Sequence, residues 1–117
     1  MDKRSKKDEE EYVFEELEKI EREYQIKMKT YGIPIVKVVA YYTRKLKACM
    51  VFIFFKDEKT LQQFSAQQLD FFKQTYFDFL REKNLMPQYI EVIDGFYFDS
   101  DENVQKNFHG NYFIAKL

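Results

Sequence analysis

The chain has 117 residues, of which 45% are hydrophobic and 33% charged, a balance typical of one globular domain over residues 1–117. Its formal net charge of −1 argues against nucleic acid as the main ligand, because phosphate binding needs a basic surface. With only three glycines the chain cannot form a glycine-rich phosphate-binding loop, and its one cysteine cannot form an internal disulfide.

The amino-terminal residues are charged and lack an apolar run, so we expect residues 1–7 to be frayed and not to form a secretory signal. The longest apolar run, ACMVFIFF at Ala48–Phe55, is far too short to span a membrane. An unpaired cysteine suits a reducing compartment. We therefore expect a cytoplasmic protein that binds no membrane.

Residues 8–30 carry apolar side chains at spacings of three and four, which predicts an amphipathic helix. Gly32 and Pro34 then end it, since neither continues a helix readily. One stripe holds the apolar members, Val13, Leu17, Ile20, Tyr24 and Met28.

Residues 33–43 and 47–56 are rich in β-branched and aromatic side chains and predict two strands joined by a short hairpin. The hairpin belongs to a segment, residues 32–60, with six basic and two acidic side chains and so a net charge of +4. Both strands are apolar on both faces. Each face therefore needs a cover, and either helices supply both covers or one face is kept for a partner.

A second helix, rich in aromatic side chains, is predicted over residues 58–83 as the main packing partner of the sheet. Residues 88–99 and 111–117 again show strand composition. The order is therefore α-β-β-α-β-β. We predict an α+β fold with a mainly antiparallel sheet of about four strands packed with two helices.

The stretch DSDENVQKNFHG, residues 99–110, contains a cluster of acids and the only histidine. Its acids fit the first positions of a calcium loop, but Val104 and Gly110 stand where that loop needs a glycine and a bidentate glutamate. The spacing of Asp99 and Glu102 is that of a capping box. We therefore predict a short capped helix over residues 100–107, ended at Gly110.

Catalytic chemistry has few candidates in this chain. His109 could act as a general base only beside an orienting group and a nucleophile or water. Cys49 lies among apolar neighbours, where a thiol stays protonated and inert. One histidine and one cysteine cannot form the usual zinc sets. We predict no catalytic residue, no metal and no cofactor, and a protein that is not an enzyme.

Tyrosine and arginine are enriched at the energetic centres of protein–protein interfaces, and both occur at the predicted hairpin. We therefore predict that the chain binds another protein through a tyrosine-rich and acidic surface. Its candidate residues are Tyr41, Tyr42, Arg44, Lys45, Asp94, Tyr97, Asp99, Asp101, Glu102 and His109.

The element order, the small size and the acidic pI of about 5.9 resemble two kinds of bacterial protein. Immunity proteins imply an inhibitor that blocks a site on its partner. Dimeric secretion chaperones imply a dimer that holds another chain. The resemblance rests on element order and composition and assigns no individual residue a role.

Two alternatives come from other classes of function. One is a small ligand-binding domain or enzyme with a pocket between the aromatic helix and the sheet, using Asp94, Asp99 or His109 as its polar group. The other is a homodimer formed through the sheet or through the first helix, whose apolar stripe is short for a coiled coil.

Overall fold

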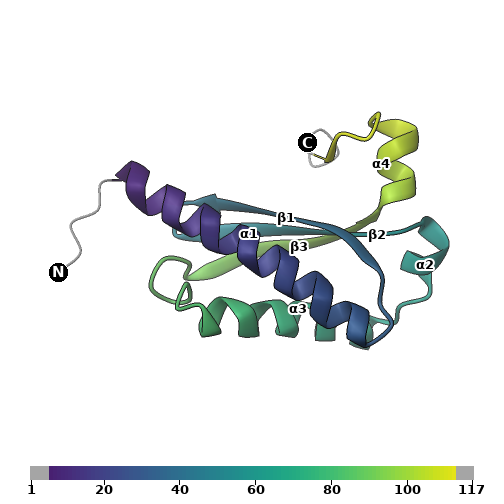
Figure 1. Ribbon diagram of the computed structural model, residues 1–117, viewed down its shortest axis with the longest axis horizontal. Helices are drawn as coiled ribbons and strands as arrows, with labels where there is room; N and C mark the ends of the chain where they lie inside the picture. The colour runs from purple at the N-terminus through teal and green to yellow at the C-terminus, as the bar shows by residue number, and fades with distance from the viewer. Residues whose placement is uncertain (1–5, 113–117) are drawn as a thin grey trace.

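The computed structural model describes residues 6–112, which form an α+β fold as predicted. The elements follow in the order α1, β1, β2, α2, α3, β3 and α4 (Figure 1). Their bounds are Lys6–Thr30, Ile35–Thr43, Ala48–Phe55, Glu58–Gln62, Ala66–Glu82, Val92–Ser100 and Asp101–Asn107.

Helix α1 begins close to its predicted start and ends at its predicted last residue. The apolar stripe of Val13, Leu17, Ile20, Tyr24 and Met28 is at most 5% exposed, so this stripe is the face that enters the core. Gly32 follows the helix with a φ of +74° and donates its N–H to the carbonyl of Lys29. Glycine adopts this left-handed conformation without steric cost, which explains the reversal into β1.

The sheet has three strands in the order β1-β2-β3, with β1 and β2 antiparallel and β2 and β3 parallel. The prediction of about four mainly antiparallel strands is therefore correct only in part. The chain between β2 and β3 contains α2 and α3, and a helical crossover of this length returns a strand parallel to the one it left. The predicted strand at 111–117 lies largely outside the described residues, and Asn111 and Tyr112 are not in a strand.

The predicted second helix, residues 58–83, is two helices. Asp57 caps α2 by accepting the N–H of Thr60, and Ser65 caps α3 by accepting the N–H of Gln68. The Gln68 side chain accepts the N–H of Ser65 in return, which completes a capping box. These bonds satisfy backbone donors that a continuous helix would bond internally, so the chain breaks before Ser65.

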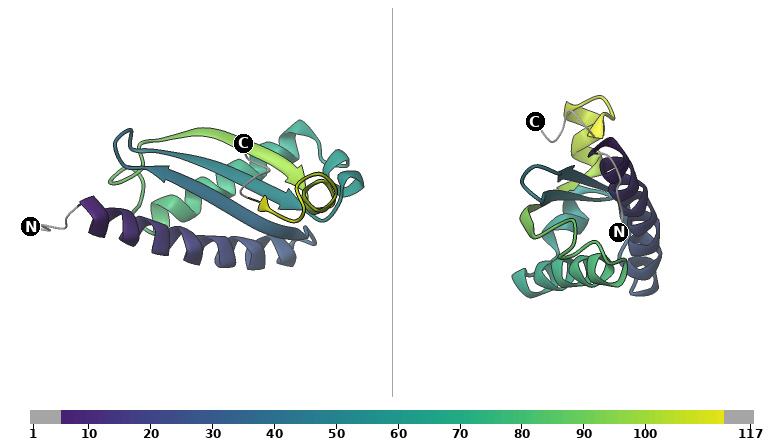
Figure 2. Two further views of the ribbon diagram at one scale, coloured as in Figure 1. Left: turned by 90° about the horizontal axis from the view of Figure 1, so that it is seen from above. Right: turned by 90° about the vertical axis from the view of Figure 1, so that its left-hand side faces the viewer.

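One face of the sheet packs against α1 and α3 and forms the main core. Figure 2 shows α3 beneath the strands and α1 along the β1 side, while α4 stands over one end of the opposite face. The central strand β2 is buried along seven of its eight residues. Aromatic rings dominate the contact with α3: the Phe55 ring lies 5.7 Å from that of Phe72, and the Tyr76 ring 5.9 Å from that of Phe96.

Candidate functional site

The residues that the structure describes cover the sheet face opposite the main core only in part. Its register sets Tyr41 beside Met50 and Phe52 beside Tyr97 across the three strands. The rings of Phe52 and Tyr97 stack with centroids 4.9 Å apart, and Tyr41 meets Phe52 edge-on at 6.5 Å. Tyr41 is 39% exposed and Tyr97 48% exposed. We call Tyr41, Met50, Phe52, Val92 and Tyr97 the open face.

Gly95 explains how the Tyr97 ring can lie across the sheet. A Cβ atom at Gly95 would come within 2.8 Å of the Tyr97 ring. The glycine thus leaves room for the ring to cover the strand and stack on Phe52. The β2–β3 register is irregular between Cys49 and Met50, which pair with Ile93 and Gly95. This extra residue in β3 determines which sheet face each later side chain of β3 occupies, and it places Tyr97 beside Phe52.

Helix α4 covers the other end of the same face. Val104 is fully buried there with Val39, Phe52 and Phe54, and the Tyr112 ring meets that of Phe54 at 4.8 Å. The sequence predicted that both faces of β1 and β2 need a cover, and this small second core supplies part of the cover of the second face. Within residues 6–112, helices cover one face and one end of the other, and the open face is the part that they leave uncovered.

The adjacent tyrosines of β1 have opposite environments. Tyr41 lies on the open face, whereas Tyr42 is 7% exposed and joins the main core. The Tyr42 hydroxyl donates to Glu9 at 3.5 Å, and burial together with this carboxylate raises the pKa of Tyr42 to about 12. Tyr42 therefore supports the core and is not available to a partner.

The basic hairpin tip is partly neutralised by its neighbours. Arg44 lies 3.5 Å from a carboxylate oxygen of Glu9 and 3.9 Å from one of Glu10, both on α1. Lys45 is exposed beside it. The tip is thus tied to the first turns of α1 and retains Lys45 as a charge that faces solvent.

The acids of the 99–110 stretch mainly hold α4 in place. Ser100, one residue after the predicted cap Asp99, is the actual N-cap and accepts the N–H of Asn103. Asp99 accepts from the Asn103 side chain, and Glu102 accepts the backbone N–H of Glu58 at 3.1 Å. This last bond, with an ion pair to Lys106, lowers the pKa of Glu102.

Two further groups complete this end of the sheet. Asp101 accepts hydrogen bonds from the Tyr112 hydroxyl and from the side chain of Gln105. His109 is exposed, just beyond α4, with a φ of +53°. Asp94 is exposed in β3 near the hairpin end and so lies apart from the other candidate acids. The predicted acidic surface is therefore divided between the two ends of the sheet.

Cys49 and His109 are not brought together. Cys49 pairs with Tyr42 near the hairpin, whereas α4 stands over the opposite end of the strands (Figure 1). Burial raises the pKa of the Cys49 thiol to about 12, so it is protonated at neutral pH. Among residues 6–112, no three His, Cys, Asp or Glu side chains gather where they could hold a metal ion.

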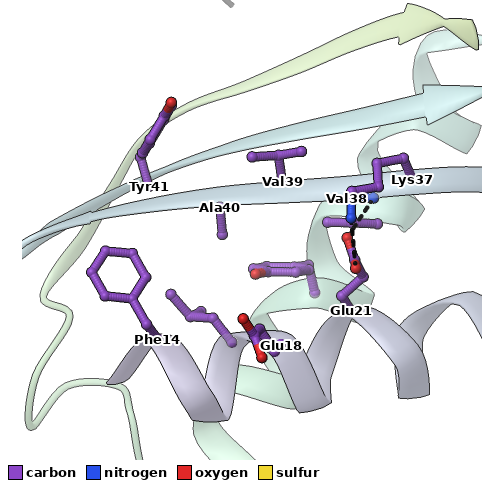
Figure 3. Close-up of a pocket in the computed structure, with 10 residues that line it drawn as sticks. Phe14, Glu18, Glu21, Lys37, Val38, Val39, Ala40 and Tyr41 are labelled. Carbon is purple, nitrogen blue, oxygen red and sulfur yellow. Dashed lines mark hydrogen bonds and ion pairs between the residues drawn. The ribbon is translucent and has the colours of Figure 1, made fainter. Parts of the chain in front are cut away.

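A cleft of about 200 Å³ lies between α1 and the outer edge of β1 (Figure 3). Phe14, Leu17 and Val38 give it apolar walls, and Glu18, Glu21 and Lys37 bring charge to its rim. Tyr76 reaches it from α3, and Tyr41 lines both this cleft and the open face. Further along the molecule, between α3 and the sheet, aromatic rings fill the space.

The sequence pointed to Tyr41 and Tyr97 but missed Met50, Phe52 and Val92 on the same face. The signal was present in β2, whose apolar side chains occur at every position. Nothing in the sequence distinguished Glu18, Glu21 and Tyr76, since each is spaced like an ordinary member of its helix.

Comparisons with protein-family models, curated proteins and solved structures found no match to this chain. In the part of the chain that the structure describes, no helix combines the length and apolar character needed to cross a membrane.

Proposed function

We propose that this protein is a non-enzymatic protein-binding module that inhibits its partner by covering a site on it. The observation that carries the proposal is the aromatic group of the open face, Tyr41, Phe52 and Tyr97. These rings already contact one another across the three strands, so a partner that packs against them orders few additional side chains. Such preorganised aromatic groups are typical of the centre of a binding surface.

The composition of this surface favours a different protein over a second copy of the chain. Both exposed tyrosines carry hydroxyls, and charges of both signs, Lys45 and Asp94, are exposed toward the hairpin end. An aromatic centre with a polar rim is typical of interfaces between proteins that also exist apart, whereas obligate dimer interfaces are larger and more apolar.

The acids near α4 can contribute at the edge of the surface. Asp101 and Glu102 are only partly exposed and already accept hydrogen bonds within the fold. Their charge would therefore steer a basic partner and raise its association rate more than it would raise affinity. This places the tyrosines at the energetic centre of the proposal and the acids around it.

The test begins with position-specific cross-linking. Tyr97→p-benzoylphenylalanine in the full chain, expressed in the source organism, should cross-link to one protein, whereas the same amino acid at exposed Gln67 on α3 should not. The captured protein is then purified, and its affinity for the unmodified chain is measured by calorimetry. Its own activity, where it has one, should fall when the complex forms.

The variants Tyr41→Ala and Tyr97→Ala should each weaken that affinity by at least about tenfold, the loss expected of an aromatic hot spot. Tyr31→Ala is the matched control, because Tyr31 is 56% exposed but contacts Phe71, away from the open face. Light scattering of the isolated chain should give a monomer. A dimer that dissociates in Tyr97→Ala would show instead that a second copy covers the open face.

A further inference from the structure

The cleft between α1 and β1 occurs where α1 stops bonding to the outer edge of the sheet. Glu21 accepts the N–H of Val38 at 3.0 Å, and the Gln25 side chain donates to the carbonyl of Val36 at 2.8 Å. Outward backbone groups alternate along an edge strand, so those of Ala40 face the same side two residues after Val38. Ala40 lines the cleft (Figure 3).

On α1, Glu18 precedes Glu21 by three residues, nearly one helical turn. Its position relative to Ala40 therefore corresponds to that of Glu21 relative to Val38. Glu18 lines the cleft and is exposed, and within residues 6–112 no hydrogen bond or ion pair engages its carboxylate. Glu21 already binds Lys37 at 3.2 Å. The charged groups that face the cleft are therefore two carboxylates and one ammonium, which leaves one negative charge without a partner.

Tyr76 supplies a second and independent indication of a ligand. Its side chain is fully buried, it lines the cleft, and its hydroxyl has no hydrogen-bond partner among the described residues. Buried hydroxyls are normally satisfied, because an unpaired one loses its hydration without compensation. Burial is the main cause of the raised pKa of Tyr76, with smaller contributions from Cys49, Tyr24 and, at the rim of the cleft, Glu21.

We propose that this cleft binds the side chain of a lysine from the partner protein. The ammonium group would donate to the Glu18 carboxylate and to the Tyr76 hydroxyl, and the methylene stem would pack on Phe14, Leu17 and Val38. The volume of about 200 Å³ suits one side chain and is smaller than the ~300–1,000 Å³ of pockets for drug-sized ligands.

The identity of the occupant rests on the proposed function, since Tyr41 lines both the open face and the cleft. A partner seated on the open face could therefore extend one basic side chain past the β1 edge. The preference of the cleft for a cation is independent of that function and can be measured without the partner.

The test is an NMR titration of the full chain with n-butylammonium chloride, at constant ionic strength, with 1-butanol as the uncharged probe. We expect saturable shifts at Leu17, Val38 and Ala40 with n-butylammonium only. Glu18→Gln should weaken its binding about three- to fivefold, the effect of a partly exposed ion pair. Glu15→Gln is the matched control, because exposed Glu15 is absent from the cleft lining and should leave affinity unchanged.

Tyr76→Phe tests whether the Tyr76 hydroxyl binds the cation or only stabilises the fold. It should weaken n-butylammonium binding by roughly two- to tenfold, as the loss of one hydrogen bond does, while the urea midpoint of the free chain stays equal or rises. A lower midpoint would show that the hydroxyl is already satisfied in the free protein and would contradict the proposal.

Equal shifts with 1-butanol, or unchanged affinity in both Glu18→Gln and Tyr76→Phe, would also overturn the lysine site. Those results leave the open face untouched, because its own test is the loss of partner affinity in Tyr41→Ala and Tyr97→Ala. Conversely, the chain could bind n-butylammonium while Tyr41→Ala and Tyr97→Ala leave partner affinity unchanged. That result would contradict the proposed function but support the cation site.

Discussion

Three core positions show how much environment changes the chemistry of a side chain. The Tyr24 hydroxyl is buried and donates to the carbonyl of Phe72 at 2.9 Å, whereas that of Tyr76, whose ring lies 5.6 Å away, has no such acceptor among residues 6–112. Cys49, near the hairpin end of β2, is buried with its thiol protonated. Burial raises the pKa of all three groups, because the ionised form would lose its hydration, so each stays neutral to a higher pH than in the unfolded chain.

These raised pKa values predict that the fold is sensitive to alkaline pH. The pKa of Cys49 rises from 9.0 to about 12 on folding, and those of Tyr42 and Tyr112 rise from 10.0 to about 12. The unfolded chain therefore loses these protons at lower pH than the folded chain. The stabilisation is complete below about pH 9 and is lost progressively as the pH rises toward 12.

Urea denaturation at pH 7.5, 9.0, 10.5 and 11.5 measures this dependence. The midpoint should hold up to pH 9.0 and then fall. Cys49→Ala should remove the earliest part of the fall, because the thiol has the lowest unfolded-state pKa of the buried groups concerned. A midpoint that stays constant to pH 11.5 would contradict the assignment of these groups to the buried neutral state.

At the scale of elements, helix ends are decided by single polar side chains. Ser65 divides the predicted second helix, and Ser100, not Asp99, caps α4. The Ser100 hydroxyl also donates to Glu58 at 2.6 Å, so it joins the start of α2 to the end of β3. Sequence spacing alone made Asp99 and Glu102 an equally good cap, and only the packing of α2 against this end selected Ser100.

Two variants separate these caps. Ser100→Ala should lower the free energy of unfolding by about 1–2 kcal/mol, since it removes a cap and leaves a partly buried Glu58 oxygen without its donor. Asp99→Ala should cost less than about 1 kcal/mol, because the cap remains. Urea denaturation followed by circular dichroism measures both free energies of unfolding, since the chain has no tryptophan for fluorescence. An equal loss in the two variants would contradict the assignment of Ser100 as the N-cap of α4.

Helix α1 acts as the cover of a sheet edge. Edge strands expose unpaired backbone groups that can recruit other strands, and proteins commonly cover them. Here Glu21 and Gln25 provide bonds to β1 as a neighbouring strand would. The cover stops short of Ala40, and the cleft proposed to receive a lysine is the part of the edge that remains.

At the scale of the molecule, the two sheet faces have different amounts of cover. Among residues 6–112, the main core joins α1, α3 and one face of the sheet, whereas the second core at α4 holds four buried residues. Stability should therefore vary across the fold, because local opening is least costly where few apolar contacts are lost.

Amide hydrogen exchange followed by mass spectrometry measures this difference. The amides of β2 should exchange most slowly, since the strand is central and buried, and those of α4 and α2 should exchange much faster. In Val104→Ala, α4 should lose protection while α1 keeps its own, because Val104 is the buried contact of α4. Equal loss across α1 and α4 would indicate that the two cores open as one unit.

The sequence by itself determined the elements whose signals are local. The stripe of α1, the two strands of the hairpin and the positive-φ stop at Gly32 each follow from spacing or from one residue type. Side-chain alternation also showed that β1 and β2 need cover on both faces. These features depend on interactions between residues close together in the chain, which is why the pattern predicts them.

Only the tertiary structure decided that β3 pairs with β2 in parallel, what covers each face and where a cleft remains. The parallel position of β3 depends on the α2–α3 crossover, and in the described part of the chain α4 covers one end of the second sheet face and leaves the open face. Glu18 and Tyr76 are 58 residues apart in numbering and line one cleft only because α1 and α3 pack on the same sheet. The energy of such contacts depends on the distance in space between residues far apart in the chain, which residue spacing does not predict.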